Sequence, residues 1–459
     1  MSFNLLIENK YDQSIYFGYD TLNKKECDFN TALYGVPFLE TLVIKRDIEY
    51  FLGKNLKFIY PISGLDETMY EEAPFKLDSS IIDACKQGQC KVGIMFDTEG
   101  VASGKIGKEG LLLWLQAFAK LNGVDDTNFF FAHGDRKLHQ TYIDLLKARL
   151  IDNKSRVKIL KYSYFENFPW FLPPSIGRVS PTKEQLLEHA EGIINSNRKV
   201  KKEKHFLCLN RILRLPRLIL FGTIASNPDL EEKTILSIGR QEKTGLIVQD
   251  IFNDNTLNIK PTDQVSNYIN SYDFNNPKHI LDNPDNSNKA FVVNTHFHQS
   301  TFLNIVTETL HQEDTIFFSE KIFKPVYMLQ PFILIGNPNS LKELQQMGYK
   351  TFSKWWDESY DEEIELVTRI SKVEKILKEL SKLSVDELHK ITQEMEETLV
   401  HNFNRFLFDI KQETLDYLNF FILQNPPPSY PTKTFKLQVA GEKIKIQPHY
   451  KVTTQKYLI

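Results

Sequence analysis

The 459-residue chain has few cysteines and no long uncharged hydrophobic run. Its four cysteines, Cys27, Cys85, Cys90 and Cys208, lack the paired CxxC spacing of a structural zinc site, so we expect reduced thiols. No run approaches the roughly eighteen apolar residues of a membrane-spanning helix. The opening residues, MSFNLLIENKYDQ, also lack the basic and apolar regions of a secretory signal. These absences predict a cytoplasmic protein without a transmembrane segment.

An excess of charge of one sign is also lacking. The 56 Lys and Arg residues nearly balance the 59 Asp and Glu residues, which leaves a formal net charge of −3. No global basic field therefore indicates a nucleic-acid partner. The composition, 41% hydrophobic and 25% charged, is typical of a globular protein. The length predicts two domains of roughly 200 residues each.

The first half of the chain alternates strand-like and helix-like patterns. Apolar runs that end in polar turns, as buried strands do, are followed by segments with an apolar helical face. Three such alternations predict a parallel sheet with covering helices. The expected strands are 91–96, 128–133 and 156–166, and the expected helices are 110–121 and 140–151. Nearer the amino terminus, runs 3–7 and 56–62 are expected in the same sheet, and runs 14–19 and 41–44 in a hairpin-like insertion.

A dense positive run at 197–206 marks the expected domain boundary. A solvated linker is the simpler interpretation of this run, and a patch that attracts phosphate is the alternative. Beyond it the α/β pattern restarts with a strand at 205–211 and a helix within 212–226. Residues 227–290 are polar, with weak strand signals at 234–238 and 244–249, and are expected to form a loop-rich insertion or a partly ordered cover.

The carboxy-terminal part predicts amphipathic helices within 354–383 and 385–423, whose charge runs are expected on solvated faces. A homodimer through these helices is an alternative, although a sustained heptad is lacking. Two alternating runs around Ala440 and Gly441 predict a β-hairpin after a proline-rich linker. The predicted division is an amino-terminal domain at 1–195, a second domain at 200–425, and a linker with hairpin tail at 426–459.

The stretch around which the chain is organised contains two glutamates placed at the ends of regular elements. Apolar runs at 303–306 and 332–336 flank a helix-like segment, and Glu308 follows the first run. The helix-like segment opens at Ser319, Glu320 and Lys321. Because ligands of open α/β sheets sit at the carboxyl ends of strands and the amino ends of helices, we expect the active site here.

FLNIVTET followed by IFFSEKIFKPVYMLQPFILIG resembles the donor-binding signature of the alpha-1,3-fucosyltransferases. In that family a strand ends in Glu, and a Thr-Glu-Lys triplet then opens a helix. Glu308 matches the strand-end Glu, and Ser319-Glu320-Lys321 matches the triplet with Ser in place of Thr. The step from Glu308 to Glu320 is longer than in the family pattern. The resemblance is confined to residues 290–352.

This resemblance implies a nucleotide-sugar transferase of α/β class, with two Rossmann-like domains facing across a cleft (GT-B). It implies that Glu320 holds the nucleotide ribose and that Lys321 holds a phosphate, while the sugar stays open. An ionised carboxylate accepts hydrogen bonds only, so Glu320 suits a pair of ribose hydroxyls. On local grounds alone, Ser319-Glu320-Lys321 is also compatible with a simple helix cap.

Basic side chains for a leaving diphosphate follow from the residues themselves. Arg211 at the end of the expected strand, with Arg214 and Arg217 in the following turn, places three guanidinium groups near one helix start. Fork-shaped donors and the helix dipole both favour anions there. Surface arginines that pair with unrelated carboxylates are the alternative. Together with Lys321 and Lys324, Arg211 and Arg214 are the candidate diphosphate ligands.

The acceptor hydroxyl of an inverting transfer needs a general base. Asp97 and Glu99, which follow an apolar strand, are the first candidates, and His133 and Asp135 come next. On local grounds, a turn acid after a strand is more often a helix cap, and a single histidine in a turn is more often structural or solvated. His296 and His298 would suit metal ligands on one face of a strand, but no third ligand is evident, so no metal is expected.

The sequence therefore predicts a metal-independent, inverting glycosyltransferase. Its expected partners are a nucleotide-sugar donor, with GDP-fucose as one candidate, and a glycan acceptor, without a further cofactor. In a rival hypothesis Asp97 and Glu99 hold Mn²⁺ or Mg²⁺ in a GT-A-like transferase. In a second rival hypothesis the chain is a non-catalytic module that binds a glycan or a protein.

Overall fold

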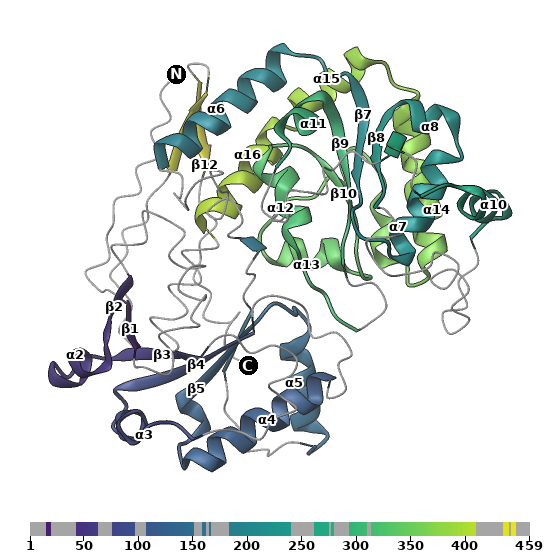
Figure 1. Cartoon of the computed structure of the whole chain (residues 1–459). Helices are drawn as coiled ribbons and strands as arrows, with labels where there is room; N and C mark the ends of the chain where they lie inside the picture. Colours follow the sequence, from purple (N-terminus) through teal and green to yellow (C-terminus); the bar gives the residue numbers. More distant parts are fainter. Residues whose placement is uncertain are drawn as a thin grey trace.

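The chain in its computed structural model forms two α/β units and a separate hairpin (Figure 1). The structure describes residues 15–19, 43–62, 76–96, 107–150, 158–161, 165–166, 183–239, 261–274, 277–279, 293–309, 314–409, 435–439 and 442–446.

The first unit is built on a 6-stranded sheet with the order β2-β1-β3-β4-β5-β6, in which all neighbours are parallel. The strands are β1 (Ile15–Tyr19), β2 (Val43–Asp47), β3 (Phe58–Ile62), β4 (Cys90–Phe96), β5 (Phe129–His133) and β6 (Lys158–Lys161). Aromatic and β-branched residues, which fit a pleated buried surface, dominate β3 and β5.

The hairpin-like insertion expected near the amino terminus is wrong. β1 and β2 are parallel neighbours, with Ile15 opposite Val43, and β1 also pairs with β3. Parallel strands need a crossover connection of about a dozen or more residues, and the sequence between β1 and β2 is long enough to supply one. Local strand patterns do not carry strand direction, so the sequence alone left this pairing open. The expected strand at 3–7 lies outside the described residues.

The two faces of the first sheet have different partners. Successive residues of a strand point to opposite faces. Phe129 and Phe131 pack with the unit's own helices, and the ring of Phe118 meets that of Phe129 at 5.5 Å. Phe130 and Ala132 instead belong to a core that continues into the second unit. The helices are α2 (Ile48–Gly53), α3 (Ser79–Lys86), α4 (Gly107–Asn122) and α5 (Leu138–Lys147), with a 3-10 turn η3 (Asp126–Asn128).

The second unit is built on a 4-stranded parallel sheet with the order β10-β9-β7-β8. Its strands are β7 (Lys204–Leu209), β8 (Thr234–Ser237), β9 (Thr301–Thr307) and β10 (Phe332–Ile335). Counted along the chain within each unit, both sheets begin with the same strand order, second-first-third-fourth. Each sheet therefore has a switch point between its first and third strands, where the winding direction reverses.

The helices around the second sheet include several that the sequence did not predict. They are α7 (Leu215–Ala225), α8 (Pro228–Glu232), α10 (Asp263–Ser271), α11 (Thr295–Ser300), α12 (Glu320–Tyr327) and α13 (Ser340–Gln346), with a 3-10 turn η7 (Pro277–His279). α7 is buried on all sides, and a Cβ at Gly222 would come within 2.8 Å of Ile269 on α10. The expected loop-rich insertion thus contains α8, β8 and α10. The weak strand at 244–249 lies outside the described residues.

Helix α6 (Lys183–Lys199), which joins the two units, packs with the second one. Leu186 and Ile193 belong to the buried cluster that the two units share, and α6 contacts α15 and α11 of the second unit. The ring of His189 stacks on Tyr327 of α12 at a centroid distance of 4.2 Å. The domain division at residues 195–200 stays a prediction, and this packing favours a boundary before Lys183.

The carboxy-terminal helices are amphipathic, as predicted, but shorter than their patterns suggested. They are α14 (Leu366–Ser381), α15 (Val385–Glu394) and α16 (Glu396–Asn404), preceded by η9 (Ser359–Glu362) and followed by a π-helical turn η10 (Arg405–Asp409). Val373 and Leu377 of α14 are fully buried in the chain's own core, so this apolar face is not available to a second copy. The homodimer stays a prediction. None of the helices in the described ranges is both long and apolar enough to cross a membrane.

The two units meet at the carboxyl edges of their sheets. The turn after β5 carries Arg136, whose backbone N–H donates to the carbonyl of Ile316 at 2.8 Å. Arg136 Nε also lies 2.9 Å from Glu343 Oε1. Ile316 lies between β9 and α12, and Glu343 lies on the helix that follows β10. Both contacted segments leave carboxyl ends of strands, so the carboxyl edges of the two sheets face each other here.

The predicted α/β fold class with two Rossmann-like units is therefore confirmed. The terminal hairpin is also confirmed, because β11 (Phe435–Val439) and β12 (Glu442–Ile446) pair antiparallel.

Candidate functional site

The residues predicted to bind a donor gather at the switch point of the second sheet. β7 and β9 are neighbours there, while the chain continues from β7 to β8 on one side and from β9 to β10 on the other. Ligands of open parallel sheets bind outside the carboxyl ends of the strands at such a point. Asn210 follows β7, and Thr307 ends β9. Thr307 Oγ1 donates to Asn210 Oδ1 at 2.5 Å, which ties the two strand ends together.

Glu308 continues directly from β9 and is buried, with 3% of its surface exposed. Its carboxylate accepts the backbone N–H of Ser319 at 3.2 Å and the Ser319 hydroxyl at 2.6 Å. Burial raises the pKa of Glu308 above its ordinary value, against the opposing effects of Lys321 and the Ser319 hydrogen bonds. Glu308 thereby joins the end of β9 to the start of α12, as the predicted pairing of these segments requires.

Ser319, Glu320 and Lys321 form one hydrogen-bonded group at the start of α12. Ser319 is the N-cap, and its hydroxyl oxygen accepts from the Lys321 backbone N–H at 3.4 Å and lies 3.2 Å from Lys321 Nζ. Lys321 Nζ also lies 2.9 Å from Glu320 Oε1. The helix-cap explanation is therefore correct for Ser319, but the cap also brings an acid, an ammonium group and the buried Glu308 together.

Glu320 is an ionised carboxylate held by cations. Only 8% of the residue is exposed, and burial alone would raise its pKa. The charges of Lys321 and Lys324 and the hydrogen bond from Lys321 outweigh burial, so the pKa of Glu320 lies below its ordinary value. Lys324, one turn further along α12, thus belongs to the same electrostatic group, as the sequence predicted.

The start of α7 supplies arginines to the same region. Arg214 is the N-cap position of α7, with an extended backbone and no side-chain cap, and Arg211 is exposed between β7 and this helix. A helix amino terminus carries a partial positive charge and free N–H groups, so an anion is favoured there. Gly239, beyond β8, packs so closely that a Cβ would come within 1.5 Å of the Arg211 carbonyl oxygen. This contact fixes the backbone that presents Arg211.

Arg217 lies inside the first turn of α7 and is buried, not in the preceding turn as expected. Its Nη1 donates to the carbonyl of Ile212 at 3.0 Å. Burial, followed by repulsion from Arg214, lowers the pKa of Arg217 to about 10, while Glu308 and Glu320 act in the opposite direction. Within the described part of the chain, Nε of Arg214 and Nε of Arg217 are buried without a hydrogen-bond partner. Buried guanidinium nitrogens in this state are suited to an anionic ligand.

A side chain of α14 forms a hydrogen bond to the backbone just after β10. A Cβ at Gly336 would come within 2.6 Å of Ser340 Oγ and 3.8 Å of Glu308 Cγ, so glycine allows close packing beside Glu308. Arg369, which is buried, donates to the carbonyl of Gly336 and, at 2.8 Å, to that of Glu363. The glycine expected at the end of this strand therefore supports the site by packing.

The predicted catalytic base is not located by the structure. Asp97 and Glu99 lie outside the described residues, so their role stays a prediction. Of the second choices, His133 is fully buried, and its Nδ1 accepts the Asp135 backbone N–H at 2.7 Å. The Asp135 carboxylate accepts the backbone N–H of Lys137 at 2.9 Å. Both contacts build the turn after β5.

The expected placement of His296 and His298 on one face of a strand is wrong, because both lie on α11. His296 is exposed, whereas His298 is buried with Nδ1 2.7 Å from Gln330 Oε1. Burial lowers the pKa of His298 to about 4, so this side chain is a neutral core histidine. No group of three or more potential metal ligands occurs among the described residues.

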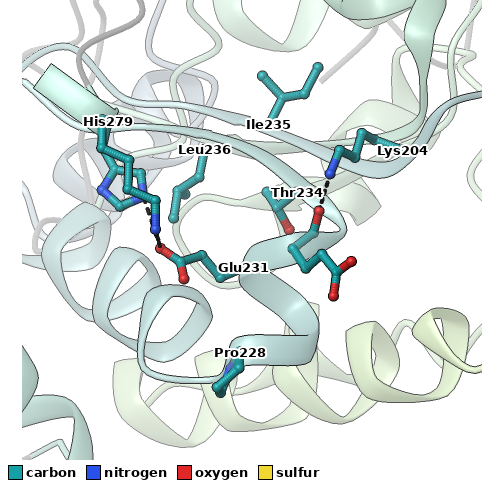
Figure 2. A pocket seen from close by; sticks show the side chains of 9 residues that line it. Lys204, Pro228, Glu231, Thr234, Ile235, Leu236 and His279 are labelled. Atoms are coloured by element: carbon teal, nitrogen blue, oxygen red, sulfur yellow. Dashed lines mark hydrogen bonds and ion pairs between the residues drawn. The ribbon is translucent and has the colours of Figure 1, made fainter.

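Two hollows in the described surface are lined by residues other than those predicted to bind a donor. One, of about 490 Å³, borders β8 and is lined in part by Lys204, Glu231 and His279 (Figure 2). In Figure 2, Glu231 faces His279, and the two side chains approach to 3.1 Å. Another, of about 480 Å³, lies between α8 and α14. Neither is lined by a predicted donor-binding residue.

Sequence reasoning missed some residues that shape the site. Asn210 and Thr307 pair across the switch point, and Arg217 was grouped with its neighbours in the turn although it is buried between them and the acids. Asn210 and Thr307 carried a usable signal, since each is a polar residue at the end of an apolar strand. The inward direction of Arg217 follows from its place in a helix that is buried on every side, which only the packing reveals.

No family model matches the sequence, and no curated protein matches it. Among solved structures, the N-terminal domain of Candida albicans trehalose-6-phosphate phosphatase has a TM-score of 0.39 at 12% identity, over 83% of this chain and 72% of that chain. The UDP-forming alpha,alpha-trehalose-phosphate synthase of Burkholderia vietnamiensis has a TM-score of 0.36 at 10% identity, over 84% and 81%. The alpha,alpha-trehalose 6-phosphate synthase of Burkholderia multivorans has a TM-score of 0.30 at 13% identity, over 84% and 82%. At these scores, the fold rests on the chain's own strand order and contacts.

Proposed function

We propose that this chain is a glycosyltransferase that binds a nucleotide-sugar donor at the carboxyl ends of β7 and β9. The observation that carries the proposal is the hydrogen-bonded group of Glu308, Ser319, Glu320 and Lys321 at the start of α12. It lies in the electrostatic field of the arginines of α7. With Arg211, Arg214 and Arg217 of the α7 region and Lys324 of α12 added, the five cations of this region outnumber its two acids, which suits a ligand that carries several negative charges.

The diphosphate of the donor is assigned to the start of α7. Arg211 and Arg214 provide fork-shaped donors there, and the helix amino terminus provides backbone N–H groups. Arg217 stays buried beneath them and contributes positive potential. An anion at this position would relieve the repulsion between Arg214 and Arg217 that lowers the pKa of Arg217. Lys321 and Lys324 approach from the start of α12.

The nucleoside is assigned to Glu320, whose lowered pKa keeps it an acceptor for ribose hydroxyls. Glu308 has a different role in the proposal. It stays a proposed donor-site residue, and because its carboxylate also binds Ser319, it sets the start of α12. The resemblance to the alpha-1,3-fucosyltransferases makes GDP-fucose the first donor to test.

The reaction proposed is inverting transfer to a glycan hydroxyl without a metal ion, in a cytoplasmic protein. Departure of the nucleoside diphosphate is aided by the cations of α7 and α12, which stabilise the negative charge that develops on it. Asp97 or Glu99 is proposed as the base that takes the proton of the acceptor hydroxyl. In the rival metal-dependent hypothesis these two acids hold a divalent ion, so transfer would be lost in EDTA and would not depend on Lys321.

A thermal-shift panel of UDP-, GDP-, CMP- and TDP-sugars tests the proposal. A ligand that binds only the folded state at a hundredfold of its Kd stabilises it by about 2.7 kcal/mol. We expect one nucleotide class to raise the melting temperature of the unaltered chain, and Glu320→Gln and Lys321→Met to abolish the shift. Lys378→Met, which removes a half-exposed partner of Glu374 on α14, is the matched control and should retain it.

Transfer assays with the same donors separate the remaining hypotheses. A nucleotide that binds but is never transferred or hydrolysed would favour a non-catalytic module. Equal shifts in the unaltered chain, Glu320→Gln and Lys321→Met would contradict the assigned donor site.

A further inference from the structure

The turn after β5 in the first unit forms hydrogen bonds to residues 314–318 of the second unit, the segment that leads to α12. The Arg136 backbone N–H donates to the Ile316 carbonyl at 2.8 Å, and the Ile316 N–H reaches Asp135 Oδ1 at 3.4 Å. Both backbone groups of Ile316 are therefore directed at the first unit. Asp135 also accepts the Lys137 backbone N–H at 2.9 Å, so the turn is held in shape by the same carboxylate.

Side chains reinforce this backbone contact. Arg136 Nε and Glu343 Oε1 lie 2.9 Å apart, and each side chain is only 10% exposed. A pair shielded to this degree is much less weakened by solvent and salt than a surface pair. Lys137 and Asp314 also pair, but they are exposed and add little. Arg136 therefore contacts both α13, through Glu343, and the segment between β9 and α12, through Ile316.

Residues 314–318 lead directly to the candidate donor site. Thr315 and Phe318 are buried, and the Thr315 carbonyl accepts from Asn337 Nδ2 at 2.6 Å. The ring of Phe317 meets Phe165 at 5.9 Å. Ser319, which caps α12 and binds Glu308, comes next in the chain. A displacement of Ile316 would thus pass through a short, packed segment to the Ser319–Glu308 contact.

We infer that Asp135 and Arg136 are positioning residues for the second unit's donor site: they hold residues 314–318 so that Ser319 stays on Glu308. Through these contacts the first unit, the proposed acceptor side, is coupled to the proposed donor-binding residues at the start of α12. The ligand part of the inference rests on the proposed function, whereas the positioning part rests on the contacts alone.

Hydrogen exchange followed by mass spectrometry on the full-length chain tests the positioning part without any ligand. In Arg136→Ala we expect amides of residues 314–321, which include those of Ile316 and Ser319, to exchange at least about tenfold faster, equivalent to about 1.4 kcal/mol. Peptides from β4 and α14 should keep their rates, which shows that both units stay folded. Arg198→Ala is the matched control, because it removes a bidentate arginine–glutamate pair to Glu396 elsewhere in the second unit. It should leave 314–321 unchanged.

A charge-swapped variant distinguishes positioning from a general loss of structure. Arg136→Glu combined with Glu343→Arg should restore protection of 314–321 above that of either single variant. Unchanged exchange in Arg136→Ala, or no recovery in the swapped pair, would overturn the positioning role.

Binding of GDP and UDP to the same variants tests the coupling to the donor site. For a nucleotide bound by the unaltered chain, we expect Arg136→Ala to raise its Kd in parallel with the faster exchange, and the swapped pair to lower it again. An unchanged Kd together with faster exchange would overturn the coupling. If neither nucleotide nor any nucleotide sugar binds the unaltered chain while exchange behaves as expected, the proposed function fails and the positioning role stands.

Discussion

At the scale of single residues, Ser319 has two structural roles, as the cap of a helix and as the hydrogen-bond partner of a buried acid. Its hydroxyl caps α12, and the same hydroxyl and its backbone N–H satisfy the buried carboxylate of Glu308. A buried carboxylate without such partners is costly, because desolvation disfavours its charged form. The strand-end acid therefore depends on the first residue of the triplet motif as much as the helix does.

Ser319→Ala is expected to lower the free energy of unfolding by about 1–3 kcal/mol, the range for a lost cap and for a buried polar group that loses a partner. Urea unfolding measures the change, and nucleotide binding should weaken at the same time. The control is Ser384→Ala, which removes the N-cap of α15 from an exposed capping box. The control should lose stability but keep nucleotide binding. Equal binding by Ser319→Ala and the unaltered chain would contradict this account.

Lys202, just before β7, is expected to make stability depend on pH. It is buried, with Nζ bonded to Asn197 Oδ1 at 2.8 Å and to the Gln299 carbonyl at 3.0 Å. Burial lowers its pKa from 10.5 to about 8 in the folded chain. Between these values the unfolded state binds the proton and the folded state does not. Stability from this group therefore rises with pH across that window, and its cost is fully present below pH of about 8.

Unfolding of the unaltered chain and of Lys202→Met, measured between pH 7.5 and 10 in steps, tests this sign. The unaltered chain should gain stability relative to Lys202→Met as the pH rises through this range. The exposed neighbour Lys199→Met is the control and should follow the unaltered chain. A difference between the chain and Lys202→Met that stays constant with pH would refute the buried-amine explanation.

At the scale of elements, the candidate donor site depends on how closely helices approach the second sheet. α7 presents Arg214 at its start and is buried on every side, so α10 must pack directly against it. Gly222 makes this approach possible, since Ile269 and Val265 occupy the space that its Cβ would fill. The polar segment after α8, expected to be a loop-rich insertion or a partly ordered cover, contains α10, which covers this helix.

In Gly222→Ala the added methyl group overpacks a filled interface, which costs about 1–3 kcal/mol. Alanine favours a helix over glycine by about 1 kcal/mol, so we expect a net destabilisation of up to about 2 kcal/mol. Gly192→Ala, on α6, is the matched control, since nothing lies within 4 Å of the added Cβ. It should stabilise the chain by up to about 1 kcal/mol. Thermal unfolding of both variants gives the two signs, and a gain for Gly222→Ala would show that α10 can move away.

At the scale of the whole molecule, the two units share a core. Ile59, Phe130 and Leu160 of the first sheet belong to the cluster that contains Phe206 and Phe302 of the second sheet. A continuous buried cluster and the Arg136–Glu343 pair both oppose separate unfolding of the units, since each unit would expose apolar surface and an unpaired charge if its partner unfolded.

Unfolding is therefore expected to be a single transition. Variants that keep only Trp114 or only Trp356, with the other tryptophans changed to Phe, report on the first and the second unit. Both side chains are buried, with 6% and 7% exposure. Urea transitions followed by fluorescence should coincide in the two variants. Two separate midpoints would show that the units unfold independently.

Much of the secondary structure followed from the sequence, because hydrophobic period depends on neighbours close in the chain. The runs at β4, β5, β7 and β9 and the helices α4, α5, α7 and α12 were predicted correctly. The pairing of Glu308 with Ser319, Glu320 and Lys321 was also predictable, since all lie at element ends of one strand–helix step. What failed was strand direction, because β1 and β2 are parallel where a hairpin-like insertion was expected.

The sequence by itself determined the two α/β units and the acid–ammonium group at the start of α12. Only the tertiary structure decided that Arg217 is buried, that His296 and His298 lie in different surroundings, and that Arg136 reaches Ile316 and Glu343. Charge and periodicity are properties of a chain segment, whereas burial depends on what packs against it from far along the chain. Long-range packing therefore turned a recognisable motif into a site with a defined electrostatic environment.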